Sequence, residues 1–352
     1  MATLRELSEI TGYSITTISR VLNGDETLKV TENTRSMILE AAGKVDYPSK
    51  QNAGRKNGAG MHLKLGIVEM VTDQESEKDP YYLYVKNNVE KCCFENEIET
   101  FVMQYDEEEE CYRSAVSREL DGILAIGQFR EGQIAAMEKC TSRIVFLESA
   151  PFPEKFCSVM PDYEVGIRQG VEYLIAQGHR RIVFVGPEFS TDSTCRQAPE
   201  LRRKIFSEYM KRREGDAEGL LMDAEWQGDD VAEQIMQYVK GIQEADELPT
   251  AFFTYNETTA LGVFRALQIM GYRVPSDFSI LGYNDTALAT MMQPQLSGIR
   301  INIEEMVRQA VWLMQRMAKG NGEIPVRISV PATLVIRESV QKARVHERRK
   351  EG

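Results

Sequence analysis

The stretch ITGYSITTISRVLN, residues 10 to 23, carries side chains that could act on a nucleic acid. Its apolar residues recur at the i, i+3, i+4 spacing of one helix face, namely Ile18, Val21 and Leu22. Another face carries hydroxyls, an amide and a guanidinium, from Thr16, Ser19, Asn23 and Arg20. Hydroxyls can reach phosphates or base edges, and arginine can bind guanine O6 and N7 together. An amphipathic helix packed on the rest of the protein explains the same periodicity, so both interpretations stay open at this point.

Three short helices are expected around this stretch. The sequence predicts them at about 3 to 10, 14 to 22 and 31 to 45. Ser14 and Thr31 stand where helix N-caps are expected, and Gly12 supplies the turn between the first two helices. The segment that follows, SKQNAGRKNGAG at residues 49 to 60, is polar, basic and glycine-rich, which is typical of a linker.

Charge is distributed unevenly along the chain. The net charge is −12, yet the first 60 residues carry eight Lys and Arg against seven Asp and Glu. DNA phosphates repel an acidic body, so DNA binding has to come from a small segment held away from it. The N-terminal helices are therefore the candidate DNA-binding segment.

Composition and length limit the remaining classes of protein. A chain of 352 residues is long enough for two cores, and 42% hydrophobic with 27% charged residues is typical of a soluble globular protein. No apolar run approaches the length of a membrane helix, and the first residues do not form a signal-peptide core, so a cytoplasmic protein is expected. Six cysteines and three histidines lack metal-site spacing, so reduced thiols and no metal or cofactor are expected.

From about residue 63 the pattern alternates short apolar runs with amphipathic helical stretches. The expected strands are KLGIVEMV, IETFVMQY, DGILAIG, RIVFLE, RIVFVG, GLLMD, TAFFTY, FSILGY, VRISV and ATLVIRE. The expected helices include 81 to 95, 163 to 177, 257 to 271 and 303 to 319. Apolar strands separated by helices predict doubly wound α/β sheets, and their number favours two domains over one. Ligands of such sheets bind beyond the carboxyl ends of the strands, so polar residues after strands are the candidates for a cleft site.

The stretch TLRELSEITGYSITTISRVLN resembles the N-terminal signature of the lactose-repressor family of bacterial transcription regulators, which ends in A-G-V-S-x-x-T-V-S-R-V-L-N. The segment VTENTRSMILEAAGKVDY resembles that family's third helix. Ser8 and Thr11 replace alanines of the pattern, and Tyr13 replaces a valine. The resemblance implies a three-helix helix-turn-helix module over residues 1 to 48 and a body of the type I periplasmic sugar-binding kind.

The resemblance also implies which residues contact operator DNA. Base-reading positions fall on Ile15, Thr16 and Arg20, with a thymine methyl as the target of Ile15 and guanine as the target of Arg20. Backbone-contact positions fall on Thr3, Leu4, Ser14, Thr17, Ser19, Asn23 and Thr34.

The linker, residues 49 to 61, departs most from the family. Members usually continue into a hinge helix whose leucine wedges into the minor groove, but Lys56 occupies that position here. Glycines at 58 and 60 further weaken a helix. Lys50, Arg55 and Lys56 remain expected phosphate contacts, and an unstructured basic tether is the alternative to a hinge helix.

The resemblance extends through the body, on SVMPDYEVGIRQGVEYLIAQGHRRIVFVG, TAFFTYNETTALGVFRALQIMGYRVPSDFSILGYND and QPQLSGIRI. Three crossings between subdomains are implied. The N-subdomain is expected at 62 to 160 plus 292 to 321, and the C-subdomain at 161 to 291 plus 322 to 340, before a charged tail at 341 to 352. That tail lacks leucine heptads, so a homodimer is expected rather than a tetramer.

Sugars are bound by polar groups that pair with hydroxyls and by aromatic rings that cover the sugar's apolar face. Positions for that work in the family map onto Arg202, Asn256 and Asn284. Asp162 could bind the sugar or cap the following helix, with capping favoured, and Trp226 could stack on the sugar or be an ordinary packed residue. The first-subdomain wall is expected from Met70, Tyr81, Tyr82 and Gln128, although aromatics that open a helix are often part of the core.

A repressor of a sugar-utilisation operon is therefore the expected function. The segments DPYY and NGDETLKVTENTR resemble sequences of the family branch that controls galactose and β-galactoside operons. Galactose or a galactoside is therefore the expected effector, and pseudo-palindromic operator DNA is the expected partner. The chain shows no assembled catalytic motif, which argues against an enzyme. A periplasmic sugar-binding protein shares the body fold but does not explain the N-terminal pattern. A regulator with another effector or a phosphoprotein corepressor remains an alternative.

Overall fold

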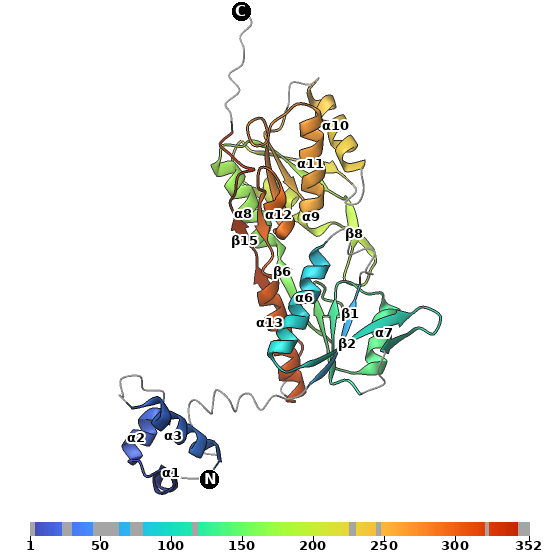
Figure 1. The fold of residues 1–352 in the computed structure, drawn as a ribbon. Helices are drawn as coiled ribbons and strands as arrows, with labels where there is room; N and C mark the ends of the chain where they lie inside the picture. The colour runs from blue at the N-terminus through green and yellow to red at the C-terminus, as the bar shows by residue number, and fades with distance from the viewer. Residues whose placement is uncertain are drawn as a thin grey trace, which may run out of the picture. The chain divides into compact units, whose positions relative to one another are not determined.

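The computed structural model divides into two compact units, one holding the N-terminal helices and one holding the sheets and helices from residue 63 onward (Figure 1). The described residues are 4–22, 30–44, 63–70, 80–114, 119–224, 230–243, 248–320 and 324–343. Within these ranges, no helix combines the length and the apolar character that a membrane crossing requires.

The N-terminal unit contains the three predicted helices, α1 (Leu4–Thr11), α2 (Ile15–Leu22) and α3 (Glu32–Lys44). Its core is formed by Leu7, Ile18, Val21, Leu22, Ile38 and Ala42. The Ser14 hydroxyl accepts the Thr17 amide at 3.1 Å and the Thr31 hydroxyl accepts the Thr34 amide at 3.2 Å, which confirms both predicted caps. Gly12 has φ +74°, a left-handed conformation that favours glycine in the turn.

The three departures from the family pattern form local hydrogen bonds in this unit. The Ser8 hydroxyl donates to the Tyr13 carbonyl at 2.7 Å, and the Thr11 hydroxyl donates to the Leu7 carbonyl at 2.6 Å. The Tyr13 and Thr34 hydroxyls lie 3.4 Å apart. Each of these three hydroxyl groups therefore has a hydrogen-bond partner. This explains how larger polar residues fit three positions that smaller apolar residues usually occupy in the family.

The second unit contains two doubly wound sheets, as predicted. The first sheet has the order β14-β6-β5-β4-β1-β2-β3 and is parallel except for β3. Its strands are β1 (Lys64–Glu69), β2 (Glu99–Asp106), β3 (Cys111–Ser114), β4 (Gly122–Ile126), β5 (Ile144–Leu147), β6 (Cys157–Asp162) and β14 (Arg327–Pro331). Strands β1, β4 and β5 are buried almost throughout, which explains their continuous apolar sequences.

The second sheet has the order β10-β7-β11-β12-β13-β15, with only β15 antiparallel. Its strands are β7 (Arg181–Gly186), β10 (Glu218–Asp223), β11 (Ala251–Thr254), β12 (Ser279–Asn284), β13 (Ser297–Arg300) and β15 (Thr333–Val335). A separate hairpin pairs β8 (Phe189–Thr191) with β9 (Gln197–Pro199). This hairpin and strands β3, β6 and β13 are absent from the predicted set, because each is short or polar and none shows a sustained apolar run.

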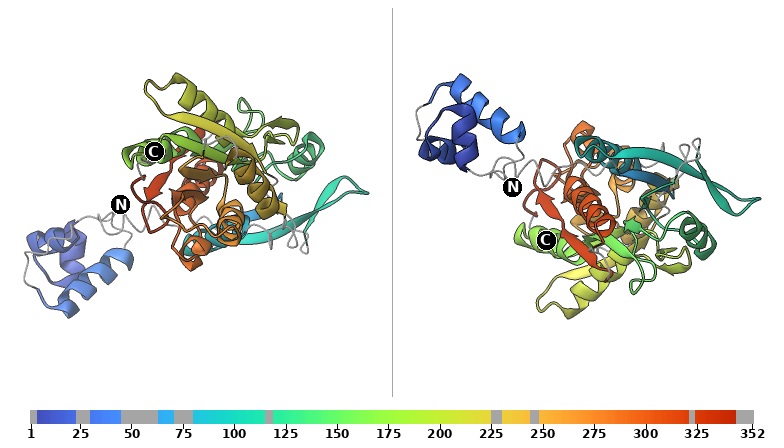
Figure 2. Two further views of the ribbon diagram at one scale, coloured as in Figure 1. Left: turned by 90° about the horizontal axis from the view of Figure 1, so that it is seen from above. Right: turned by 90° about the horizontal axis from the view of Figure 1, so that it is seen from below.

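Helices cover both faces of each sheet. They are α6 (Tyr81–Glu95), α7 (Glu131–Cys140), α8 (Tyr163–Ala176), α9 (Leu201–Arg212), α10 (Asp230–Gln243), α11 (Glu257–Ile269), α12 (Ala287–Met291) and α13 (Ile303–Ala318). In the first sheet, α6 and α13 lie side by side, while α7 packs with the β2–β3 edge (Figure 1). Figure 2 shows the β2–β3 hairpin extending away from the rest of its sheet.

The strand order corrects two of the predicted subdomain boundaries. Strand β13 pairs with β12 in the second sheet, although residues 292 to 301 were expected in the N-subdomain. Strand β14 pairs with β6 in the first sheet, although residues 322 to 331 were expected in the C-subdomain. The later crossings therefore fall between β13 and α13, and between β14 and β15. The cause is strand pairing over long sequence distances, which local apolar runs do not encode.

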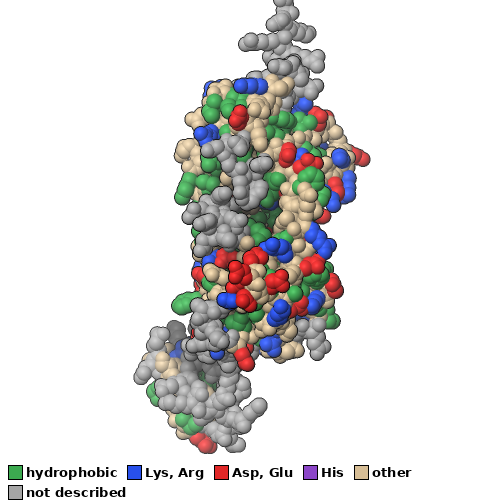
Figure 3. Space-filling model, turned by 90° about the vertical axis from the view of Figure 1, so that its right-hand side faces the viewer, with side chains coloured by type: hydrophobic (Ala, Val, Ile, Leu, Met, Phe, Trp, Pro, Cys, Tyr) green, Lys and Arg blue, Asp and Glu red, His purple; other side chains and the backbone are tan. Residues whose placement is uncertain are grey.

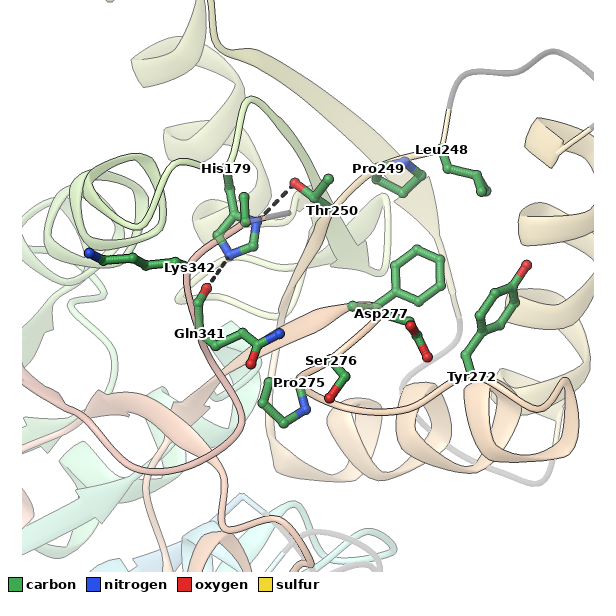
Figure 4. A pocket seen from close by; sticks show the side chains of 12 residues that line it. His179, Leu248, Pro249, Thr250, Tyr272, Pro275, Ser276, Asp277, Gln341 and Lys342 are labelled. Atoms are coloured by element: carbon green, nitrogen blue, oxygen red, sulfur yellow. Dashed lines mark hydrogen bonds between the residues drawn. The ribbon is translucent and has the colours of Figure 1, made fainter. Parts of the chain in front are cut away.

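His179 binds the C-terminal segment to the second sheet beside a cavity of about 120 Å³ (Figure 4). Its Nε2 lies 3.0 Å from the Gln341 carbonyl, and its Nδ1 lies 2.9 Å from the Thr250 hydroxyl. A carbonyl oxygen only accepts, so Nε2 carries the proton and Nδ1 accepts from Thr250. The imidazole is 2% exposed, and burial lowers its pKa.

This neutral histidine predicts a loss of stability in mild acid. The unfolded chain binds a proton on His179 below a pH of about 6.5, while the folded chain resists it, so the free energy of unfolding falls as the pH drops. Between pH 7.5 and 5.5 the wild type should lose about 1 kcal/mol more than a His179→Gln variant. Urea unfolding at both pH values measures the difference, and equal losses in the two proteins would contradict the assignment.

Candidate functional site

The exposed side of α2 carries the three residues expected to read bases. Ile15, Thr16 and Arg20 are all exposed, and Ile15 keeps 43% of its surface accessible although it is apolar. The opposite side of α2 is buried in the core of the unit. An exposed isoleucine beside a hydroxyl and a guanidinium matches the mixed chemistry of a major groove, which displays thymine methyls as well as hydrogen-bonding atoms.

Five of the residues expected to contact the DNA backbone belong to the described part of the chain. Ser14 is exposed, while Leu4, Thr17, Ser19 and Thr34 are partly buried. The Ser14 and Thr17 hydroxyls lie 2.9 Å apart at the start of α2. The other predicted contacts, Thr3, Asn23, Lys50, Arg55 and Lys56, lie outside the described residues.

One face of the second unit mixes both signs of charge. Figure 3 shows Asp and Glu side chains interspersed with Lys and Arg among the described residues of that face. A face of mixed charge provides no strong attraction for a phosphate backbone.

A cavity of about 640 Å³ lies between the two sheets of the second unit. Its lining includes residues that lie just beyond the ends of parallel strands, such as Met70 after β1, Gln128 after β4 and Tyr255 after β11. This is the position that open α/β sheets provide for ligands. Four of the predicted effector residues line it, namely Met70, Tyr82, Gln128 and Arg202.

Glu148 provides a buried carboxylate in this cavity. It is 7% exposed and follows β5 directly, and its two oxygens accept hydrogen bonds from the hydroxyls of Tyr81 and Tyr163. Burial raises its pKa, against the opposing effects of these donors and of Arg202. Its φ of +70° is a left-handed conformation that costs a non-glycine residue on the order of 1 kcal/mol or more. Strain retained at the wall of a cavity is typical of a residue selected for its position.

Arg202 provides a buried cation in the same cavity. Its Nε lies 3.0 Å from Glu200, its Nη1 donates to the Tyr255 carbonyl at 3.1 Å, and its guanidinium stacks 3.6 Å from the centre of the Tyr255 ring. Among the described residues, none accepts a hydrogen bond from Nη2 of Arg202. The side chain is therefore held in place by the protein and keeps one donor group for a ligand.

Three other predicted effector residues do not line the cavity and have structural partners. Tyr81 supports Glu148, as described above. Asp162 accepts the Val165 amide at 3.0 Å and so caps α8, as the capping interpretation expects. Asn256 is 1% exposed and accepts the Thr259 amide at 2.8 Å, which caps α11. Its carbonyl oxygen is thus used at a helix terminus.

Asn284 lines a different cavity, of about 670 Å³, together with Tyr84, Arg300 and Arg308. It is 5% exposed and has φ +88°. The described effector candidates are therefore divided among two cavities, two helix caps and the Tyr81 contact that supports Glu148. Trp226 lies outside the described residues.

The sequence-based prediction did not include several residues that line the cavity between the two sheets. Glu148, Glu200, Tyr163 and Tyr255 were not among the predicted set. Glu148 and Tyr255 are the last residues of the predicted strands RIVFLE and TAFFTY, so the rule that ligands bind at strand ends could have identified them. Tyr163 opens a helix and Glu200 caps α9, positions that carry no comparable signal.

The cavity can bind a polyhydroxylated molecule. A carboxylate and a guanidinium offer acceptors and donors for hydroxyl groups, and Tyr82, Tyr163 and Tyr255 offer aromatic surface. This combination of paired polar groups and rings is the one that sugars require. Among the described residues, no group of three or more His, Cys, Asp or Glu side chains could hold a metal ion.

Comparisons with known proteins agree with this geometry. A family model described as "Periplasmic binding protein-like domain" matches residues 171–340. The chain is 30% identical over 343 residues to the HTH-type transcriptional regulator GalR of Streptococcus thermophilus, covering 97% of this chain and 100% of that protein.

Two solved structures share the fold. The lac repressor dimer bound to operator and the anti-inducer ONPF matches with a TM-score of 0.60 and 23% identity, over 97% of this chain and 99% of that one. The transcriptional regulator CelR in complex with cellobiose matches with a TM-score of 0.61 and 20% identity, over 96% of this chain and 100% of that one.

Proposed function

The chain belongs to the LacI/GalR family of DNA-binding transcriptional regulators, and from that membership we propose that it represses a sugar-utilisation operon and leaves its operator when a sugar binds the cleft cavity. The family assigns DNA binding to the N-terminal unit and effector binding to the second unit. The observation that carries the proposal is the cavity between the two sheets, where Glu148 and Arg202 lie among tyrosine rings.

We infer that the effector is galactose or a galactoside. The 30% identity to a protein named GalR over nearly the whole chain supports this choice. The two tyrosines of the DPYY segment open α6, and the second of them, Tyr82, lines the cavity. An effector of another sugar class is the alternative, and a gel-shift titration with different sugars distinguishes the two.

The DNA contacts follow from the exposed side of α2. Ile15, Thr16 and Arg20 are assigned to bases, and the surrounding hydroxyls and the basic residues of 49 to 61 to phosphates. Two copies of the chain would place two such units on a pseudo-palindromic operator, since a two-fold protein reads a two-fold site. A single half-site offers too few contacts for specific affinity.

Release requires differential affinity. A sugar can shift the protein away from DNA only if it binds the DNA-free form more tightly than the DNA-bound form. By linkage, operator DNA must weaken sugar binding by the same factor, typically about 5- to 150-fold. Closure of the two subdomains on the sugar is the movement that couples the sites in this proposal.

A gel-shift titration tests the proposal. The full chain is titrated onto DNA from its own upstream region without sugar and with galactose, lactose or glucose. Binding without sugar that weakens with galactose or lactose and not with glucose is the expected result. No binding to that DNA would contradict the repressor assignment, and binding that is unchanged by all three sugars would contradict the effector assignment.

A further inference from the structure

The β8–β9 hairpin extends from the second subdomain and is hydrogen-bonded to the first. The Gln128 amide donates to the Thr191 carbonyl at 2.9 Å, and the Thr191 hydroxyl donates back to the Gln128 side-chain oxygen. The Ala150 amide donates to the Ser193 hydroxyl at 2.9 Å. Gln128 and Ala150 follow β4 and β5, so the hairpin contacts the first sheet at its ligand-binding edge.

Two further features hold the hairpin in one position. Arg196 forms an ion pair with Glu131 at the start of α7. The Asp192 carboxylate accepts the Thr194 amide and hydroxyl, both at 2.8 Å, and the Arg196 amide at 3.1 Å. The turn is thus ordered by its own side chain as well as by the first subdomain.

This hairpin supplies an apolar part of the cavity wall. Phe189 lines the cavity and still exposes 49% of its surface. Ala198, Pro199 and Leu201 line the same cavity from β9 and the start of α9, and Leu201 is 43% exposed. A large ring left half exposed in a hairpin that is otherwise fixed offers apolar contact to a bound molecule.

The cavity is larger than one sugar ring. A hexose displaces on the order of six or seven waters, so it occupies roughly 200 Å³ at about 30 Å³ per water. The cavity measures about 640 Å³. A ring that is hydrogen-bonded to Glu148 and Arg202 therefore leaves most of the volume free, including the part lined by Phe189 and Pro199.

We propose that the β8–β9 hairpin forms a second sugar subsite, so that the effector is a galactoside of at least two rings and not free galactose. The first ring binds Glu148 and Arg202, and the apolar face of the second ring lies against Phe189. The contacts of Gln128 and Ala150 position this subsite by holding the hairpin. The inference rests on the proposed sugar effector and specifies its class.

Calorimetric titration of the full chain with galactose, lactose and β-1,4-galactobiose tests this subsite. At least one disaccharide should bind about tenfold more tightly than galactose, because the second ring removes additional apolar surface from water. Phe189→Ala should weaken disaccharide binding about tenfold and leave galactose binding within about twofold. Phe189→Tyr keeps the ring and should retain the preference.

Ile269→Ala is the matched control, since Ile269 is 62% exposed in the same subdomain and does not line the cavity. It should change neither affinity, and equal unfolding midpoints for all variants exclude a folding defect. Galactose binding as tightly as both disaccharides, or an equal loss for every sugar in Phe189→Ala, overturns the second subsite alone. Failure of all three sugars to bind overturns the assignment of galactose or a galactoside as the effector, and the subsite with it.

Discussion

Replacing Arg20 with alanine is expected to lower operator affinity about a hundredfold, with sugar affinity unchanged. Arg20 is exposed on α2, and a bidentate arginine contact to guanine contributes about 1 to 3 kcal/mol at each half-site. A two-fold complex loses this contact twice. Fluorescence anisotropy with labelled operator DNA at one fixed salt concentration measures the loss, because the phosphate contribution depends on salt.

The control for this prediction removes the same charge elsewhere. Arg212 lies on α9 in the second unit, with a side chain that is 80% exposed and paired with Glu208 on the same helix. Arg212→Ala should leave operator affinity nearly unchanged, because Arg212 is not among the residues assigned to DNA. It should also leave the free energy of unfolding nearly unchanged, because an exposed ion pair of this kind contributes little to stability. If Arg20→Ala binds operator as tightly as the control, α2 is not the reading helix. Loss of both operator and sugar binding would instead indicate a folding defect.

The largest effect on the second unit is expected from Arg202→Met. The guanidinium is paired with Glu200, and the two side chains are only 10% and 4% exposed. Removing one partner of a buried pair leaves the other charge uncompensated, which costs about 3 to 5 kcal/mol. The variant should therefore lose about that much free energy of unfolding, measured by urea denaturation, and should not bind the effector.

A second variant separates stability from binding. In the double variant Arg202→Met, Glu200→Gln, neither buried charge remains, and glutamine can still accept the Arg203 amide that Glu200 accepts at 2.7 Å. Most of the lost stability should return, while sugar binding should stay lost because the donor to the ligand is gone. Recovery of sugar binding in the double variant would show that Arg202 supports the fold and does not contact the effector.

Much of the fold could be predicted because its signals are local. The caps of Ser14 and Thr31 and the buried face of Ile18, Val21 and Leu22 depend on spacing within one helix. The buried parallel strands appear as short apolar runs for the same reason. The spacing of residues within one helix or strand is already present in the sequence, so the predicted bounds of these elements agree with the structure to within a few residues.

The effector site was predicted less completely, because polar residues have competing uses. Asn256 lies just after β11 and Asp162 ends β6, as cleft residues should, but their oxygens cap helices α11 and α8. Glu148 also lies at a strand end, yet its left-handed backbone and two tyrosine partners place its carboxylate in the cavity. Sequence position identifies the edge of the sheet but not which group is turned toward the ligand.

The sequence by itself therefore determined the family, the three N-terminal helices, the buried and exposed faces of α2 and the doubly wound class of the body. Only the tertiary structure decided that β13 belongs to the second sheet and β14 to the first, that Glu148 and Arg202 share one cavity, and that the β8–β9 hairpin lines part of it. The physical reason is that spacing within an element follows from neighbouring residues, whereas pairing between distant strands and the direction of loop side chains depend on contacts that exist only in the folded chain.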